Sequence, residues 1–92
     1  MIRSYRSRAL RRYWEKDEPG RINPDWLSRI AMLLDRLDAS KVPQDMHLPG
    51  FGFHQLRGQD RGRYSVKVSG NWRMTFGWQD EDAIDVDLED YH

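Results

Sequence analysis

Apolar residues recur with two different periods along the chain, and the change of period separates a helical part from a strand part. From Asn23-Pro24 to about Asp38 the period is that of a helix, with asparagine suited to the N-cap and proline to the first helical position. We expect this apolar stripe to face the core. It consists of Trp26, Leu27, Ile30, Ala31, Leu33, Leu34 and Leu37.

The residues before this helix predict a short strand over 2–5 and then a first helix. Ser7 suits the N-cap, the helix extends to about Lys16, and the Asp-Glu-Pro-Gly run at 17–20 ends it. Arginines fill much of its polar surface, so the first helix is a basic amphipathic element. Its apolar side consists of Ala9, Leu10, Tyr13 and Trp14.

After a long loop over 39–52, the period becomes that of strands. Strands are predicted at 54–57, 63–68, 72–78 and from 83 onward, with turns at 58–62, 69–71 and 79–82. One side of the last three strands is apolar: Tyr64, Val66, Val68, Trp72, Met74, Phe76, Trp78, Ile84, Val86 and Leu88. The other side carries Ser65, Lys67, Arg73, Thr75, Asp85, Asp87 and Glu89.

This order of elements predicts an α+β fold, in which a short N-terminal strand and two helices precede an antiparallel meander. The helices should pack on one face of the sheet. A length of 92 residues fits a single domain over 1–92. The chain has no cysteine and no apolar run long enough to span a membrane. Its N-terminus lacks the apolar region of a signal peptide, so we expect a cytoplasmic location.

The charge is zero in sum but unevenly distributed. Residues 1–73 hold all 15 lysines and arginines against 8 acidic residues, a net +7, and residues 74–92 hold 7 acidic residues and neither Lys nor Arg, a net −7. Two interpretations remain open: the basic part forms a positive surface, or the two parts neutralise each other across the sheet.

The chain ends in Asp90-Tyr91-His92, which places an acid, a phenol and an imidazole at the end of the last predicted strand. Histidine suits proton transfer near neutral pH. The polar side of the sheet adds Arg73 and Lys67, and the strand before it adds His54 and Arg57. Together these residues predict a sheet face that holds and cuts a polyanion.

Each of these residues also has a plainer interpretation when it is taken singly. The terminus is then an ordinary polar tail. Arg73 is a surface arginine paired with Asp85 or Asp87, and His54 is a solvated loop histidine. The cluster is more specific than its members, because all of it maps to one sheet face or its edge.

Five segments resemble the HigB branch of the RelE-type toxins, the toxin halves of bacterial toxin–antitoxin pairs. The resemblance covers nearly the whole chain, and the combination of its central Asn-Trp-Arg segment with the terminal Asp-Tyr-His is specific. The segments are Leu56-Arg57-Gly58, Gly62, Tyr64-Ser65-Val66-Lys67-Val68, Asn71-Trp72-Arg73-Met74-Thr75-Phe76 and Asp90-Tyr91-His92.

The resemblance implies a ribosome-dependent endoribonuclease that cuts messenger RNA in the decoding site. In such toxins the RNA's own 2′-hydroxyl attacks the adjacent phosphate, so neither a metal nor a cofactor is expected. Carried onto this sequence, Arg73 stabilises transition-state charge, and His92 and His54 supply acid and base in an order left open. Asp90 would orient an imidazole, and Tyr91 would stack on a base or transfer a proton. Arg57 and Lys67 would grip RNA phosphates.

The resemblance also implies partners. These are a small helix-turn-helix antitoxin of the HigA type, the ribosome and messenger RNA. DNA would be bound only indirectly, through the antitoxin, and no membrane is involved. The basic residues Arg8, Arg11 and Arg12 of the first helix are candidates for contact with ribosomal RNA.

Three alternatives remain beside the nuclease. A fold-related toxin that poisons DNA gyrase shares the same order of elements, and fold alone does not separate the two. A degenerate toxin would retain only antitoxin binding. A metal site built from His54, Asp90 and His92 is the weakest alternative, because their spacing matches no metal motif.

Overall fold

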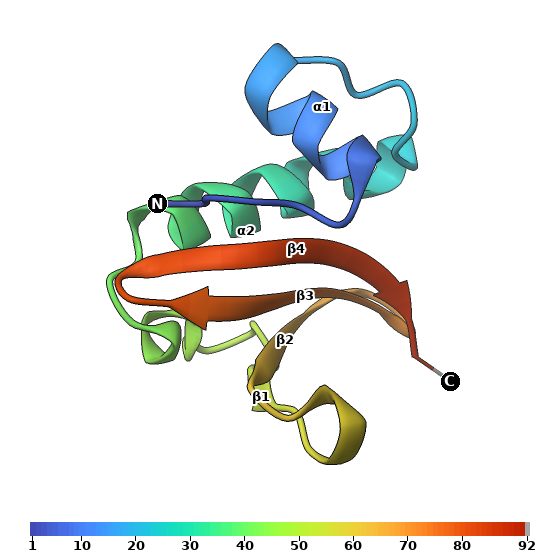
Figure 1. The fold of residues 1–92 in the computed structure, drawn as a ribbon. Coiled ribbons are helices and arrows are strands. Elements are labelled where there is room, and N and C mark those ends of the chain that lie inside the picture. Colours follow the sequence, from blue (N-terminus) through green and yellow to red (C-terminus); the bar gives the residue numbers. More distant parts are fainter. Residues whose placement is uncertain (92) are drawn as a thin grey trace.

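Two helices lie on one face of a four-stranded antiparallel sheet in the computed structural model, which describes residues 1–91 (Figure 1). The strands are hydrogen-bonded in the order β1-β2-β3-β4. This arrangement confirms the predicted α+β fold. The elements are α1 Arg8–Lys16, α2 Leu27–Ala39, β1 His54–Gln55, β2 Arg63–Ser69, β3 Trp72–Gln79 and β4 Asp82–Asp90.

Capping residues set where the helices begin and end. The Ser7 hydroxyl accepts a hydrogen bond from the Leu10 backbone N–H, and Asp17 ends α1 in the left-handed conformation. Asn23 caps a 3₁₀ turn over Pro24–Trp26, and α2 begins only at Leu27. The second predicted helix therefore starts one turn too early.

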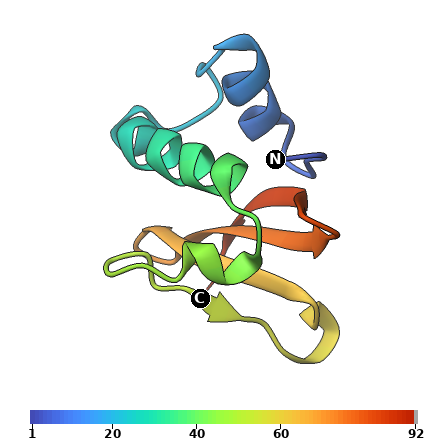
Figure 2. The same cartoon turned by 90° about the vertical axis from the view of Figure 1, so that its left-hand side faces the viewer.

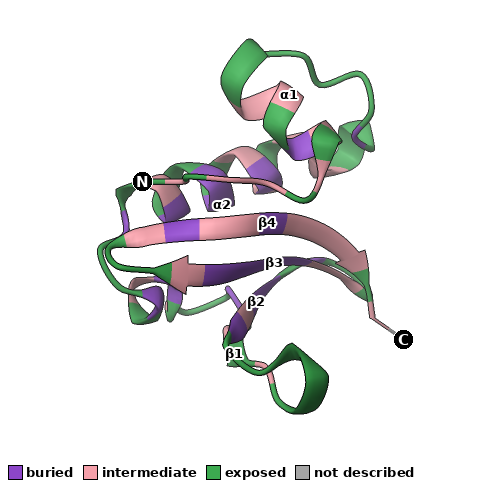
Figure 3. Ribbon diagram, viewed as in Figure 1, coloured by how far each residue is buried: buried purple, intermediate pink, exposed green. Residues whose placement is uncertain are grey.

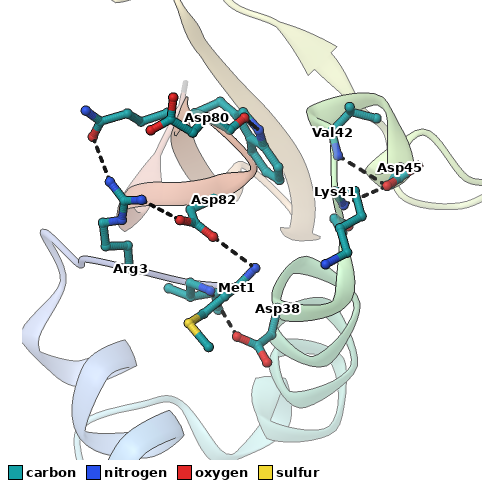
Figure 4. Close-up of polar contacts among 12 residues, drawn as sticks. Met1, Arg3, Asp38, Lys41, Val42, Asp45, Asp80 and Asp82 are labelled. Carbon is teal, nitrogen blue, oxygen red and sulfur yellow. Dashed lines mark hydrogen bonds and ion pairs between the residues drawn. The ribbon is translucent and has the colours of Figure 1, made fainter.

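The N-terminal segment does not form the predicted strand. Ile2 and Tyr5 make isolated parallel bridges with Ala83 and Val86 of β4. Figure 4 shows how the segment is held at its start, where the terminal amino group and Arg3 meet the Asp82 carboxylate. The segment thus runs along the outer edge of β4 and shields it, as sheet edges require.

A β-bulge in β4 overturns part of the predicted alternation. Gly77 pairs with Ile84, whereas Thr75 pairs with Asp87, so β4 holds an extra residue between these two pairs. Asp85 adopts a φ of 51°, the left-handed conformation that such bulges use. Since one extra residue reverses the side-chain direction, the prediction that Ile84 faces the core is wrong. Ala83 is buried there instead.

The core lies between the helices and the sheet (Figure 3). Four members of the predicted stripe on α2 are fully buried: Ile30, Leu33, Leu34 and Leu37. They pack in one cluster with Leu10 of α1 and with Met74 and Phe76 of β3. The loop predicted over 39–52 contains a 3₁₀ turn, Pro43–Met46, that closes one end of this core (Figure 2).

Candidate functional site

The face of the sheet turned away from the helices is polar, and we call it the polar face. Its members follow from the strand register, in which Lys67, Arg73 and Glu89 form one cross-strand row and Ser65, Thr75 and Asp87 form the next. The centre of the polar face is closed to solvent, because Arg63, Ser65 and Thr75 are buried there, at 8%, 1% and 0% exposure. Only its margins therefore offer side chains to a ligand.

Arg73 is half-buried and held on two sides. Its Nη1 donates hydrogen bonds to the Gly52 carbonyl at 3.0 Å and to the Ser65 hydroxyl at 3.2 Å. Neither partner is a carboxylate, so the predicted alternative of pairing with Asp85 or Asp87 is not what fixes this arginine. Both partners are neutral, and the guanidinium keeps its positive charge available for an anion.

The absence of a side chain at Gly52 lets the backbone place that carbonyl close to the strand. Its φ is +59°, and a Cβ at this position would lie 3.3 Å from the Lys67 Cβ. The loop can approach the strand this closely only without a side chain. The sequence predicts a long loop over 39–52, but it does not reveal the link of this loop to Arg73.

His54 and Lys67 flank Arg73 on the same face. His54 of β1 pairs in register with Ser65, the residue whose hydroxyl holds Arg73, and its side chain is exposed. Lys67 is the cross-strand partner of Arg73 and is also exposed. Arg57 is exposed where β1 leads into the 3₁₀ turn Gly58–Asp60.

The last described residues border a cavity of about 540 Å³ beside this turn, lined by Asp60, Glu89, Asp90 and Tyr91. Tyr91 is anchored by a hydrogen bond from its backbone N–H to the Asn71 carbonyl at 2.8 Å. Burial, and then the carboxylates of Glu89 and Asp60, raise the pKa of the Tyr91 phenol. Tyr91 therefore remains protonated at neutral pH and can donate a hydrogen bond. The prediction for His92 lies outside the described residues.

The structure also joins residues that the sequence analysis did not single out. The buried Arg63 donates through Nη2 to the Thr75 hydroxyl and to the Asp85 carbonyl, both at 2.9 Å. The Thr75 hydroxyl in turn donates to the Glu89 carboxylate. Burial, followed by the charge of Arg6, lowers the pKa of Arg63. Strand alternation put these side chains on one face, but only the register brings them together.

A second basic surface lies on α1. A cavity of about 220 Å³ is lined by Arg8, Arg11, Arg12 and Lys16. Arg11 forms an ion pair with Glu15 at 3.3 Å, and Arg12 one with Glu18 at 3.9 Å. Positive charge therefore gathers on the helix layer, although acidic neighbours moderate it.

Within residues 1–91, no three His, Cys, Asp or Glu side chains lie close enough together to hold a metal ion. The third residue of the predicted metal trio, His92, is outside this range. None of the helices in the described part of the chain is both long enough and apolar enough to cross a membrane.

Comparison with known proteins gives consistent matches along the chain. Residues 3–92 match the family of HigB-like toxins, described as the RelE-like toxin HigB of type II toxin–antitoxin systems. The chain is 29% identical to Endoribonuclease HigB of Proteus vulgaris over 92 residues, the full length of both proteins. It is 28% identical to Toxin HigB-1 of Vibrio cholerae serotype O1 over 91 residues, 97% of this chain and 96% of that protein.

Proposed function

The chain belongs to the HigB-like family of RelE-like toxins of type II toxin–antitoxin systems, and from this premise we propose that it is an endoribonuclease that cuts messenger RNA. Its target would be the codon in the decoding site of the ribosome, so that cleavage stops translation. The relative from Proteus vulgaris carries the name endoribonuclease and matches this chain from end to end.

The reaction we propose uses the RNA's own 2′-hydroxyl as nucleophile and needs neither metal nor cofactor. The 2′-oxygen attacks the adjacent phosphorus and the bond to the 5′-oxygen breaks. One protein group must accept the 2′-proton, another must protonate the leaving oxygen, and cations must stabilise the charge on phosphorus.

We assign these roles to the residues predicted from the sequence. Arg73 stabilises the charge on phosphorus, and Lys67 and Arg57 bind flanking phosphates. His54 and His92 supply acid and base, Asp90 orients an imidazole, and Tyr91 stacks on a base or transfers a proton.

The fixed geometry of Arg73 is the observation that carries this proposal. Within residues 1–91, both of its side-chain hydrogen bonds run through Nη1. Nε and Nη2 are thus left to form a fork toward a phosphate. An arginine held in place by neutral partners stabilises a developing charge without first having to reorganise.

Type II toxins pair with an antitoxin, and we propose a helix-turn-helix antitoxin of the HigA type for this chain. Binding to DNA would then run through the antitoxin alone. On the ribosome, the basic cavity of α1 formed by Arg8, Arg11, Arg12 and Lys16 is our candidate for contact with ribosomal RNA. The place of action would be the cytoplasm.

The test is cleavage of a defined messenger RNA by the purified protein on translating ribosomes, mapped by primer extension. We expect cuts within the decoding-site codon, with rates reduced roughly 100- to 1000-fold in Arg73→Ala and strongly reduced in His92→Gln. The control is Arg21→Ala, which removes an exposed arginine of the loop after α1. Circular dichroism and thermal unfolding check that each variant is folded.

Absence of cleavage by the folded wild-type protein would overturn the nuclease proposal. Inhibition of DNA gyrase would then be measured next. If that activity is also absent but an antitoxin still binds, the chain is a binding module only.

A further inference from the structure

Three side chains form a continuous hydrogen-bonded string across the polar face. It starts at the buried Arg63, passes through the fully buried Thr75 and ends at the half-buried Glu89. The three residues come from three adjacent strands, β2, β3 and β4. Strands on both sides of the Thr75 hydroxyl thus fix its position.

The direction of the hydrogen bonds in this string is determined. A guanidinium group only donates, so the Thr75 oxygen must accept from Arg63. The single hydrogen of the hydroxyl is then free to point at the Glu89 carboxylate. The bulge adds support, since the Asp85 carbonyl takes a second hydrogen bond from the same Nη2 of Arg63.

The outer end of the string lies where RNA would react. Glu89 is the cross-strand partner of Arg73 and lines the cavity together with Asp60, Asp90 and Tyr91. Its carboxylate is therefore anchored from the buried side, and it lies next to a cation and a phenol on the open side. A surface glutamate that served solubility alone would need no such anchor.

We propose that Glu89 is a catalytic residue that accepts the proton of the attacking 2′-hydroxyl, and that Thr75 and Arg63 are positioning residues that aim its carboxylate. This inference rests on the proposed ribonuclease function and assigns the base within it. Glu89 thereby replaces one of the two histidines of the proposed acid–base pair, and His54 or His92 is left as the acid. His54 lies on the same face, because it pairs in register with Ser65 beside Arg73.

The step balances without any further reactant. The 2′-oxygen forms a bond to phosphorus while its proton passes to a Glu89 oxygen. The bond from phosphorus to the 5′-oxygen breaks, and the acid gives that oxygen a proton. The products are a 2′,3′-cyclic phosphate and a 5′-hydroxyl, and Arg73 neutralises the charge on the phosphate oxygens between these states.

The decisive variant is Glu89→Gln, which keeps the size of the side chain and an oxygen that accepts from Thr75 but removes the proton acceptor. Single-turnover cleavage on programmed ribosomes, measured over a range of toxin concentrations, separates the maximal rate from the half-saturating concentration. We expect a maximal rate at least roughly 100-fold lower with the half-saturating concentration nearly unchanged. The matched control is Asp87→Asn, a carboxylate two residues earlier in β4 whose Oδ1 accepts from the Leu88 backbone N–H.

Thr75 is tested by Thr75→Val, which removes the hydroxyl at nearly constant volume, and by Thr75→Ser, which restores it. We expect Thr75→Val to lower the maximal rate roughly tenfold through misplacement of Glu89. Thr75→Ser should recover most of the loss. Because Thr75 is fully buried, Thr75→Val can fail to fold, and in that event Glu89→Gln alone decides.

The possible failures are distinguishable. If the wild type cuts RNA and Arg73→Ala does not, but Glu89→Gln cuts within about threefold of the wild-type rate, the base assignment is overturned and the nuclease stands. An increase in the half-saturating concentration with an unchanged maximal rate would also overturn it, because Glu89 would then serve binding alone. If the wild type itself does not cut, the proposed function has failed first.

Discussion

The β3–β4 pair has a closed end, where the turn between Gln79 and Asp82 joins the strands, and an open end near Trp72 and Asp90. At each end an arginine lies beside a carboxylate, but the contacts of the two pairs differ. At the closed end, Arg3 and the terminal amino group meet the Asp82 carboxylate (Figure 4). The Arg3 side chain there is 47% exposed. At the open end, Arg73 and Glu89 face each other in register. Here each is held by a buried hydroxyl, Ser65 for the arginine and Thr75 for the glutamate.

The difference separates a pair that joins two chain segments from a pair that is prepared for a ligand. The closed-end partners neutralise each other directly, and exposed ion pairs of this kind contribute little to stability. At the open end, neutral hydroxyls carry the hydrogen bonds, so both charges remain available. Buried hydroxyl groups thus position Arg73 and Glu89 at the open end, and the two charged groups remain available to a ligand.

Among changes to the supports of the two ends, the largest effect should come from Gly52→Ala, which disturbs the carbonyl that anchors Arg73. The left-handed backbone is strained by a side chain, and the new Cβ would press on the Lys67 Cβ. We expect a loss of about 1–2 kcal/mol in the free energy of unfolding. Cleavage should fall roughly tenfold to a hundredfold through displacement of Arg73. Urea unfolding and the ribosomal cleavage assay measure the two effects.

Gly50→Ala is the matched control for this prediction. Gly50 also has a positive φ, +85°, but a Cβ there meets nothing within 4 Å. It should therefore lose stability without losing cleavage. Equal loss of cleavage in both variants would show that the loop as a whole, and not the Gly52 carbonyl, controls Arg73.

Much of the fold could be predicted from the sequence, because local signals and tertiary structure agree. Ser7 caps α1 as predicted, and four members of the apolar stripe on α2 are fully buried, whereas Asn23 caps a 3₁₀ turn ahead of α2. The prediction that Ile84 faces the core failed because of the β-bulge. A bulge depends on the pairing between two strands, so the alternation within one strand does not reveal it. The prediction of a regular N-terminal strand failed for a similar reason, because the parallel bridges and backbone hydrogen bonds of this segment depend on its pairing with the distant β4.

For the candidate site, the sequence predicts which side chains share a face but not the contacts that support them. Alternation placed Arg73 and Lys67 on one face, and the register confirms that placement. The hydrogen bond of Arg73 to Gly52 depends on a loop that pairs with β2, and the one to Ser65 depends on the register of β2 against β3. No sequence spacing encodes either. The catalytic roles of Arg73 and Lys67 stay predictions until the variants are measured.

The second-largest effect is expected at the bulge of β4, which lies between the closed end and the open end. Asp85 has a positive φ and its carbonyl accepts from Arg63, so it links the backbone of β4 to the string behind Glu89. Asp85→Val should lose about 1–2 kcal/mol of unfolding free energy, because a β-branched residue tolerates this conformation poorly. Asp85→Asn should stay near wild type in a thermal melt. If both variants melt alike, the bulge does not require this conformation.

The smallest effect should come from the closed end, and its pH dependence has a definite sign. The hydrogen bond from Arg3, more than any other contact, holds the pKa of Asp82 below its usual range. A lowered folded-state pKa means that the contribution to stability is present above the unfolded value of about 3.9. It is lost as the pH falls through the folded-state pKa.

Asp82→Asn should therefore be slightly less stable than wild type near neutral pH and converge with it in acid, as measured by urea unfolding at several pH values. High salt should shrink the difference, since the pair lies at the surface. Asp45→Asn is the control, because backbone N–H groups of Lys41 and Val42 lower the pKa of Asp45 instead of an ion pair. The loss of stability in Asp45→Asn should depend on pH in the same way as that in Asp82→Asn, but high salt should not reduce it. If neither salt nor acid changes the Asp82→Asn difference, the closed end is held by backbone pairing alone, and the contrast with the open end would no longer be one of charge.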